Sequence, residues 1–204
     1  AHQIGLKTTS TIMFGHIETP RHWARHLIRL RDLQGRTGGI TEFVPLPFVH
    51  MEAPIYLKGE ARRGPSWRET VLIHSISRLV LHPLIQNIQT SWVKLGPMGA
   101  GICLDAGAND LGGTLMNETI TRSAGASHGQ EFSPEQMDNL IKKLGKTPGQ
   151  RSTLYGAVNN VQELKSYAAI PLEEVVNNNV KKYSKKVKPQ FFSTVDQKSQ
   201  HIAE

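Results

Sequence analysis

The first part of the chain passes from a β-branched run to a helical stripe of apolar positions. Residues 7–14 are β-branched and partly apolar and end at Gly15, which predicts a buried strand. Thr19 and Pro20 form the N-cap and first-turn pair with which a helix begins. Apolar residues then recur at helical spacing over residues 20–35, so a helix is expected to follow the strand.

The same order repeats further along the chain. Residues 39–46 form a second strand-like run, and Ser66 is the expected N-cap of an amphipathic helix over residues 67–81. Residues 88–94 form a third strand-like run. Strands that alternate with amphipathic helices predict βαβ units and a parallel sheet, either barrel-like or doubly wound. Three such units are about half of an eight-fold barrel or of a six-fold partial one.

Glycine and proline positions indicate the structure of residues 96–145. A glycine-rich stretch at residues 96–129 is too long and too patterned for a simple connection and predicts a functional loop region. Ser133, Pro134 and the apolar positions after them predict one more helix, which ends at Gly145.

A change of composition divides the chain into two parts. Residues 1–156 carry the expected strands and helices. Residues 157–204 are rich in Asn, Lys, Gln and Ser and are expected to form an appended polar tail, partly disordered, with a short helix near residues 172–180. At the other end, residues 1–6 resemble the end of a helix stopped by Gly5, so the chain is expected to begin within a fold.

Composition is typical of ordinary soluble proteins. Of the 204 residues, 38% are hydrophobic and 20% charged, and no run approaches the ~20 apolar residues that span a bilayer. We expect no membrane segment and a location in the cytoplasm or another soluble intracellular compartment. The net charge of +7 is spread along the chain, so no nucleic-acid site is expected. The densest basic run, interpreted as a solvated tail, is Lys181, Lys182, Lys185, Lys186 and Lys188.

Metal chemistry has little support in the sequence. Cys103 is the single cysteine, which excludes an internal disulfide and any CxxC-type metal or cluster site in this chain. His22 and His26 stand one helical turn apart, but without the carboxylate of an HExxH motif they are expected to be helix-surface residues. We predict no metal ligand in this chain, and His16, at a strand end, is the best functional candidate among the histidines.

The ends of the expected strands are the natural place for a site. In parallel α/β barrels the loops at the C-terminal ends of the strands converge on one open face. The three strand ends here are residues 15–18, 45–50 and 95–99. Each combines glycine or proline with few bulky charges, which suits a face that admits a large organic ligand.

Three separated motifs resemble a known family. Residues 8–19, TTSTIMFGHIET, resemble the fourth-strand segment of radical S-adenosylmethionine (SAM) enzymes of the deazaflavin and menaquinone pathways. Residues 105–118, DAGANDLGGTLMNE, with residues 124–131, AGASHGQE, look like the FO synthase branch in particular. Residues 150–156, QRSTLYG, resemble that branch's closing segment, so the resemblance covers about residues 1–156.

The resemblance implies a fold and a reaction. The fold would be the C-terminal half of a radical SAM partial (β/α) TIM-type barrel, with a glycine-rich loop region, a C-terminal helix and a polar tail. Family members hold a [4Fe-4S] cluster through CxxxCxxC, and the cluster reduces SAM to a 5′-deoxyadenosyl radical. The matching half of FO synthase uses this radical on L-tyrosine and joins the 4-hydroxybenzyl fragment to 5-amino-6-(D-ribitylamino)uracil. A partner half or subunit then closes the deazaflavin ring.

The missing cluster motif limits what this chain can do alone. Because CxxxCxxC does not occur in it, the resemblance places the cluster ligands in a preceding N-terminal part of about three βα units. This chain alone is therefore expected to be inactive.

The resemblance also implies site residues. The strand segment that lies against SAM corresponds to Thr9, Thr11, Met13, Gly15, His16 and Glu18. The loop that would close over the substrates corresponds to Asn109, Asp110, Gly112, Gly113 and Thr114. A buried strand and a tight turn require similar residues, so a purely structural role stays open for both sets.

Two other functions remain open. A menaquinone-pathway relative would share the strand segment, although the GGTLMNE run at residues 112–118 argues against it. A truncated, non-catalytic binding protein would use Cys103 and the histidines only structurally.

Overall fold

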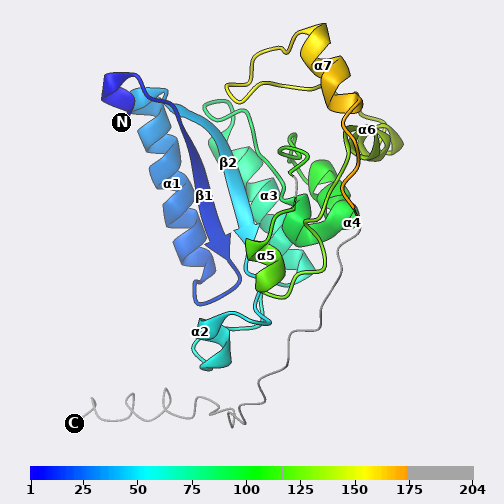
Figure 1. Cartoon of the computed structure of the whole chain (residues 1–204). Coiled ribbons are helices and arrows are strands. Elements are labelled where there is room, and N and C mark those ends of the chain that lie inside the picture. Colours follow the sequence, from blue (N-terminus) through cyan, green and yellow to red (C-terminus); the bar gives the residue numbers. More distant parts are fainter. Residues whose placement is uncertain (116, 174–204) are drawn as a thin grey trace, which may run out of the picture.

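A small parallel sheet covered by helices forms the body of the chain in a computed structural model, which describes residues 1–115 and 117–173 (Figure 1). The elements in chain order are η1 (His2–Ile4), β1 (Thr8–Phe14), α1 (Pro20–Thr37), β2 (Ile40–Pro47), α2 (Pro54–Leu57), α3 (Trp67–Leu81), α4 (Trp92–Asp105), α5 (Ile120–Ser123), α6 (Pro134–Lys143) and α7 (Asn160–Tyr167). None of the helices in this part of the chain is both long and apolar enough to cross a membrane.

The sheet is parallel, as the βαβ pattern predicts. β1 and β2 pair in parallel, with Thr9 opposite Glu42. Single parallel bridges continue the sheet from β2 to Ile88 and from Gln89 to Asp110. Both arrows in Figure 1 end on the side where α2 and α5 lie, so the C-terminal ends of the strands share one edge. A closed barrel is not formed by the described residues.

The two faces of β1 have different surroundings. Phe14 packs on Trp23 of α1 and Ile73 of α3, and all three side chains are buried. The Phe14 and Trp23 rings meet edge to face, with centroids 5.7 Å apart. Thr11 and Met13 alternate with these core positions and lie exposed on the opposite face. The helices α1 and α3 therefore cover one face of β1 and leave the other open.

The helix caps predicted from the sequence are confirmed. Ser66 Oγ accepts a hydrogen bond from Glu69 N at 3.2 Å at the start of α3, and Ser133 caps α6 in the same manner. Thr19 begins α1, where His22 Nδ1 accepts from Thr19 N at 3.1 Å. The prediction that α1 ends at Gly35 is wrong, because the helix continues to Thr37 and stops at the left-handed Gly38.

The third predicted strand, residues 88–94, is wrong beyond its first two residues. Ile88 and Gln89 make the isolated bridges, but α4 begins at Trp92. Trp92 and Val93 are both buried in the core. A short buried helical turn and a buried strand give the same apolar run, which explains why the pattern could not separate them.

The glycine-rich stretch also begins as a helix and not as a loop. The chain kinks within α4 at Gly96, which has a φ of 69°, and the helix then runs to Asp105. Gly99 and Gly101 admit Trp67 and Leu140 against the helix, where a Cβ would lie 2.7 Å and 3.2 Å from those side chains. The glycines of this segment thus serve close packing, and the loop proper follows α4.

The polar segment after residue 156 contains a helix that the pattern missed. α7 begins at the N-cap Asn159, and Tyr167 Oη donates to Asp138 Oδ2 on α6 at 3.0 Å. In Figure 1 α7 lies against α6. The helix predicted near residues 172–180 lies outside the described residues from residue 174 onward, as does the run of lysines from 181 to 188.

Candidate functional site

A cavity of about 290 Å³ opens at the C-terminal end of β2. We call it the mouth cavity; the loop after β2, the start of α3, the start of α4 and the loop at residues 125–128 form its walls. The apolar lining residues are Pro47, Phe48, Val49, Met51, Pro65, Trp67 and Leu95. The basic lining residues, which we call the basic side, are His50, Arg63, Lys94 and His128. Asp and Glu are absent from the lining residues.

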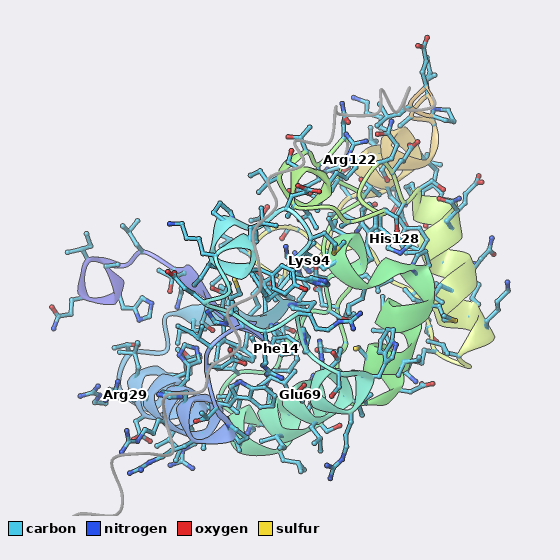
Figure 2. All side chains as sticks on the ribbon, turned by 90° about the horizontal axis from the view of Figure 1, so that it is seen from below. Phe14, Arg29, Glu69, Lys94, Arg122 and His128 are labelled. Atoms are coloured by element: carbon cyan, nitrogen blue, oxygen red, sulfur yellow. The ribbon has the colours of Figure 1, made fainter. Side chains whose placement is uncertain are left out.

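Two basic residues of the mouth cavity, Lys94 and His128, lie near the kink in α4. In Figure 2, seen from below, Lys94 lies near the middle of the molecule with His128 close by, whereas Arg29 lies on the outer side of α1. A Cβ at Gly96 would be 2.6 Å from His128 Nε2, so only glycine lets the His128 ring reach the first turn of α4.

Burial makes the basic side of the cavity electrostatically unusual. Lys94 Nζ donates to Thr121 Oγ1 at 3.1 Å, and burial lowers the pKa of Lys94 although the charge of Glu118 opposes this. Burial and the charge of Arg63 lower the pKa of His50. Burial thus disfavours the charged form of Lys94, and burial with the charge of Arg63 disfavours that of His50, so a nearby anion would stabilise both charged forms.

The turn after β1 is built around the Glu18 carboxylate. Oε1 accepts from Gly15 N at 2.5 Å and Trp23 Nε1 at 3.1 Å, while Oε2 accepts from His16 N at 2.9 Å and contacts His16 Nδ1 at 2.7 Å. Arg62 Nη2 adds an ion pair at 3.4 Å. Burial alone would raise the pKa of Glu18, but the hydrogen bonds outweigh it and lower the pKa to about 2.

Glu18→Gln is expected to destabilise the chain at pH 7 and to flatten its acid unfolding. The carboxylate binds its proton more weakly in the folded chain, so its contribution is complete above the ordinary pKa of 4.5 and is lost as the pH falls from there towards 2. Urea unfolding at a series of pH values measures the difference between wild type and variant. A difference that stays constant between pH 5 and about 2.5 would contradict this role.

Gly15 and His16 make packing contacts within the chain, and their predicted contacts with SAM remain predictions. A Cβ at Gly15 would lie 2.2 Å from Pro65 Cδ, and Gly15 has a φ of 93°. The His16 ring packs against Phe48, with centroids 5.6 Å apart. The turn therefore joins the end of β1 to the wall of the mouth cavity.

Thr9, Thr11 and Met13 occupy the open face of β1. Thr9 and Thr11 are exposed and Met13 retains 46% of its surface. Two hydroxyls and a thioether on one uncovered face would fit the ribose and the apolar parts of SAM, so a SAM contact at these three residues stays a prediction.

The side chains of Asn109 and Asp110 are held within the chain. Asn109 Oδ1 accepts from Arg78 Nη2 at 2.6 Å and from Ile88 N at 2.8 Å. Asp110 Oδ1 accepts from Gly112 N at 2.5 Å and from Arg151 Nη2 at 2.9 Å, and Arg151 Nε donates to Oδ2. Their substrate contacts remain predictions. A substrate that binds Asn109 or Asp110 must do so while these internal hydrogen bonds are kept, or must replace them.

The other predicted loop residues, Gly112, Gly113 and Thr114, follow directly after Asn109 and Asp110 in the chain. Gly113 O accepts from Trp92 Nε1 at 3.0 Å, and Thr114 is half-buried. Gly112 has a φ of 77°, and a Cβ there would lie 2.9 Å from Gln89 Nε2. The loop therefore starts from a fixed point at the end of the sheet.

A cluster of Glu42, Asp110, Arg151 and Tyr155, here called the inner cluster, ties the closing segment to the sheet. The Arg151 guanidinium lies 4.0 Å from the centroid of the Tyr155 ring and 3.7 Å from Glu42 Oε2. Tyr155 Oη donates to Glu42 Oε2 at 2.5 Å, and burial together with this bond raises the pKa of Tyr155. Residues 150–156 are thus fastened by charge and not only by packing.

Sequence reasoning did not single out Arg63, Lys94 or His128 as functional residues. They come from segments far apart in the chain, and Lys94 lay inside the run assigned to a strand. The available signal was a solitary lysine within the apolar run SWVKLGPMG.

An iron–sulfur cluster does not fit the described residues. Cys103 is fully buried, and burial raises the pKa of its thiol to about 11, which disfavours the thiolate that a cluster needs. Within residues 1–115 and 117–173, no group of three or more His, Cys, Asp or Glu could hold a metal ion. His22 caps α1, and the ring of His26 packs on Phe43.

Comparison with known proteins defines the class. Residues 37–164 match the family model described as the CofH/MqnC C-terminal region. The matched region contains the mouth cavity, the loop after α4 and the closing segment. The chain belongs to this family.

Individual relatives narrow the resemblance. The chain is 56% identical over 158 residues to the 5-amino-6-(D-ribitylamino)uracil–L-tyrosine 4-hydroxyphenyl transferase of Methanopyrus kandleri, covering 78% of this chain and 43% of the relative. It is 52% identical over 155 residues to the FO synthase of Mycobacterium tuberculosis and 52% identical over 158 residues to that of Streptomyces coelicolor. These matches cover 76% and 78% of this chain and 18% of each FO synthase. The chain thus spans less than half the length of these relatives.

Proposed function

We propose that this chain is the C-terminal part of a radical SAM transferase of the FO synthase type. The complete protein would join the 4-hydroxybenzyl group of L-tyrosine to 5-amino-6-(D-ribitylamino)uracil, and a ring-closing half or subunit would use the product. The observation that carries the proposal is the 56% identity over 158 residues to the transferase named for these two substrates. The Methanopyrus kandleri relative has this name, and the other two relatives reported above are named FO synthase.

The position of the mouth cavity supports the proposal. It opens at the C-terminal ends of parallel strands, where the chemistry of α/β barrels is carried out, so we infer that β1, β2 and their bridges are part of a partial TIM-type barrel. Thr9, Thr11 and Met13 would then face the barrel interior and hold SAM. With the cluster bound elsewhere in the complete protein, SAM supplies the radical that starts the reaction.

The chain's own residues would bind and orient the substrates. Phe48 and Trp67 would provide aromatic surfaces in the mouth cavity, and Lys94, held by its hydrogen bond to Thr121, would supply a positive charge. The loop that begins at Asp110 would close over the bound molecules and exclude water, because its first residues are anchored and its glycines permit the turn. We also infer that residues 1–156 form the enzymatic part and that the segment after 156 is an addition to it.

The test is an assay of the complete protein encoded by the gene that carries this chain. The protein is purified without oxygen, supplied with iron and sulfide, and given SAM, a reductant, L-tyrosine and the aminouracil. We expect the 4-hydroxybenzyl adduct by mass spectrometry and none without L-tyrosine. SAM cleavage without adduct, or no cluster at all, would contradict the proposal.

A further inference from the structure

We propose that the basic side of the mouth cavity binds the carboxylate of an α-amino acid, with Lys94 as the central contact and Arg63, His50 and His128 around it. The inference rests on the proposed function and assigns L-tyrosine as the amino acid. It concerns residues that neither the family description nor the names of the relatives identify.

Lys94 has no close counter-ion among the described residues, which is the first argument for an anion site. In the part of the chain that the structure describes, no carboxylate lies within ion-pair distance of Lys94 or Arg63, and Lys94 Nζ contacts only a neutral hydroxyl at 3.1 Å. Glu118 attracts Lys94 from further away. A half-buried ammonium without a close counter-ion is costly, and a bound carboxylate would offset this cost.

The neighbouring arginine provides an internal contrast. Arg62 pairs with Glu18 at 3.4 Å and with Glu69 at 2.7 Å, which fastens the turn after β1 to the start of α3. Arg63 instead lines the cavity beside His50 and adds to its positive potential. Arg62 thus stabilises the fold, whereas Arg63 is available to interact with a ligand.

Size and apolar surface indicate which anion fits. A cavity of about 290 Å³ lies at the small end of ligand sites, which suits an amino acid better than a large cofactor. The lining also includes Phe48 and Trp67, whose rings suit an aromatic ligand. Of the two substrates in the relative's name, only L-tyrosine carries a carboxylate and an aromatic side chain. SAM also has a carboxylate, so the experiment must separate the two.

The decisive experiment compares ligands with and without the carboxylate on the complete protein. Binding of L-tyrosine and tyramine is measured by calorimetry in wild type, Lys94→Met, Lys94→Arg and Lys142→Met. Lys142 is an exposed lysine of α6 and serves as the matched control. We expect Lys94→Met to weaken L-tyrosine binding on the order of ten- to a hundredfold, the range for a lost charge-assisted hydrogen bond, with tyramine binding nearly unchanged. Lys94→Arg should retain most of the affinity, and Lys142→Met all of it.

The outcomes separate this inference from the proposed function. If wild type forms the adduct but Lys94→Met binds L-tyrosine as tightly as before, the carboxylate assignment is wrong and the function stands. If Lys94→Met raises the KM for SAM and not that for L-tyrosine, the cavity holds the carboxylate of SAM and the inference is overturned. If Lys94→Met does not fold, Arg63→Ala, an exposed position, must show a several-fold loss for L-tyrosine and none for tyramine. Absence of adduct from wild type would contradict the function instead.

Discussion

Replacing Asp110 by alanine is expected to lower the free energy of unfolding by about 3 kcal/mol. The carboxylate is 8% exposed and takes two hydrogen bonds from Arg151, so its removal leaves a guanidinium with reduced access to water beside Tyr155. Breaking a buried pair costs about 3–5 kcal/mol, and the lower end applies because Arg151 is 28% exposed. Urea unfolding of the purified chain measures the change.

An exposed pair supplies the matched control. Asp32 contacts Arg31 at 3.3 Å with both side chains about half exposed, so Asp32→Ala should cost less than about 1 kcal/mol. A double-mutant cycle with Arg151→Ala should return a coupling of about 1–3 kcal/mol. If Asp110→Ala costs no more than the control, the inner cluster does not stabilise the fold.

The same variants separate the two roles proposed for Asp110 in the complete protein. If Asp110 positions the loop through Arg151, Asp110→Ala and Arg151→Ala should lower adduct formation to a similar degree while SAM cleavage continues. If Asp110 contacts a substrate directly, its own variant should raise the KM for that substrate well beyond the effect of Arg151→Ala.

Gly15→Ala is expected to destabilise the chain by about 3 kcal/mol or more. A positive φ costs a residue with a Cβ about 1–2 kcal/mol, and this Cβ would also lie 2.2 Å from Pro65 Cδ and 2.4 Å from Pro65 N. Backbone at that distance cannot move aside as a flexible side chain would. The thermal midpoint and urea unfolding of the variant measure the loss.

Gly5 offers a control with a similar positive φ. Its φ is 85° and a Cβ there would meet nothing within 4 Å, so Gly5→Ala should cost only the strain of the positive φ, about 1–2 kcal/mol. The difference between the two variants measures the packing of Pro65 on Gly15. Equal costs would show that Pro65 moves aside and that the positive φ alone accounts for the glycine at position 15.

Local signals in the sequence predicted the first half of the fold well. Ser66 begins α3 because its side chain accepts from Glu69 N, and α1 begins at Thr19, where the His22 side chain accepts from Thr19 N; both effects involve only a few neighbouring residues. β1 and β2 are readable because their β-branched runs end at glycine and proline. Residues 88–94 were misassigned because the packing of α4 on the core, which no local pattern records, decides their structure.

The sequence pointed to the strand ends where the mouth cavity lies, but not to most of the residues that line it. Strand ends pointed to residues 15–18 and 45–50, and the structure places the turn at Glu18 and the mouth cavity there. The basic side could not be foreseen, since His50, Arg63, Lys94 and His128 meet only after the chain has folded. Similarly, nothing in the sequence around Asp110 shows that Arg151, 41 positions later, binds its carboxylate.

We propose that this chain supplies the substrate-binding part of a tyrosine-using radical SAM transferase. The most direct measurement is formation of the 4-hydroxybenzyl adduct by the complete, cluster-loaded protein from L-tyrosine and 5-amino-6-(D-ribitylamino)uracil, compared with the Lys94→Met variant. We expect adduct from wild type and, in the variant, a KM for L-tyrosine raised by about tenfold or more with the KM for SAM unchanged. Cluster-loaded wild type that cleaves SAM but forms no adduct with these two substrates would contradict it.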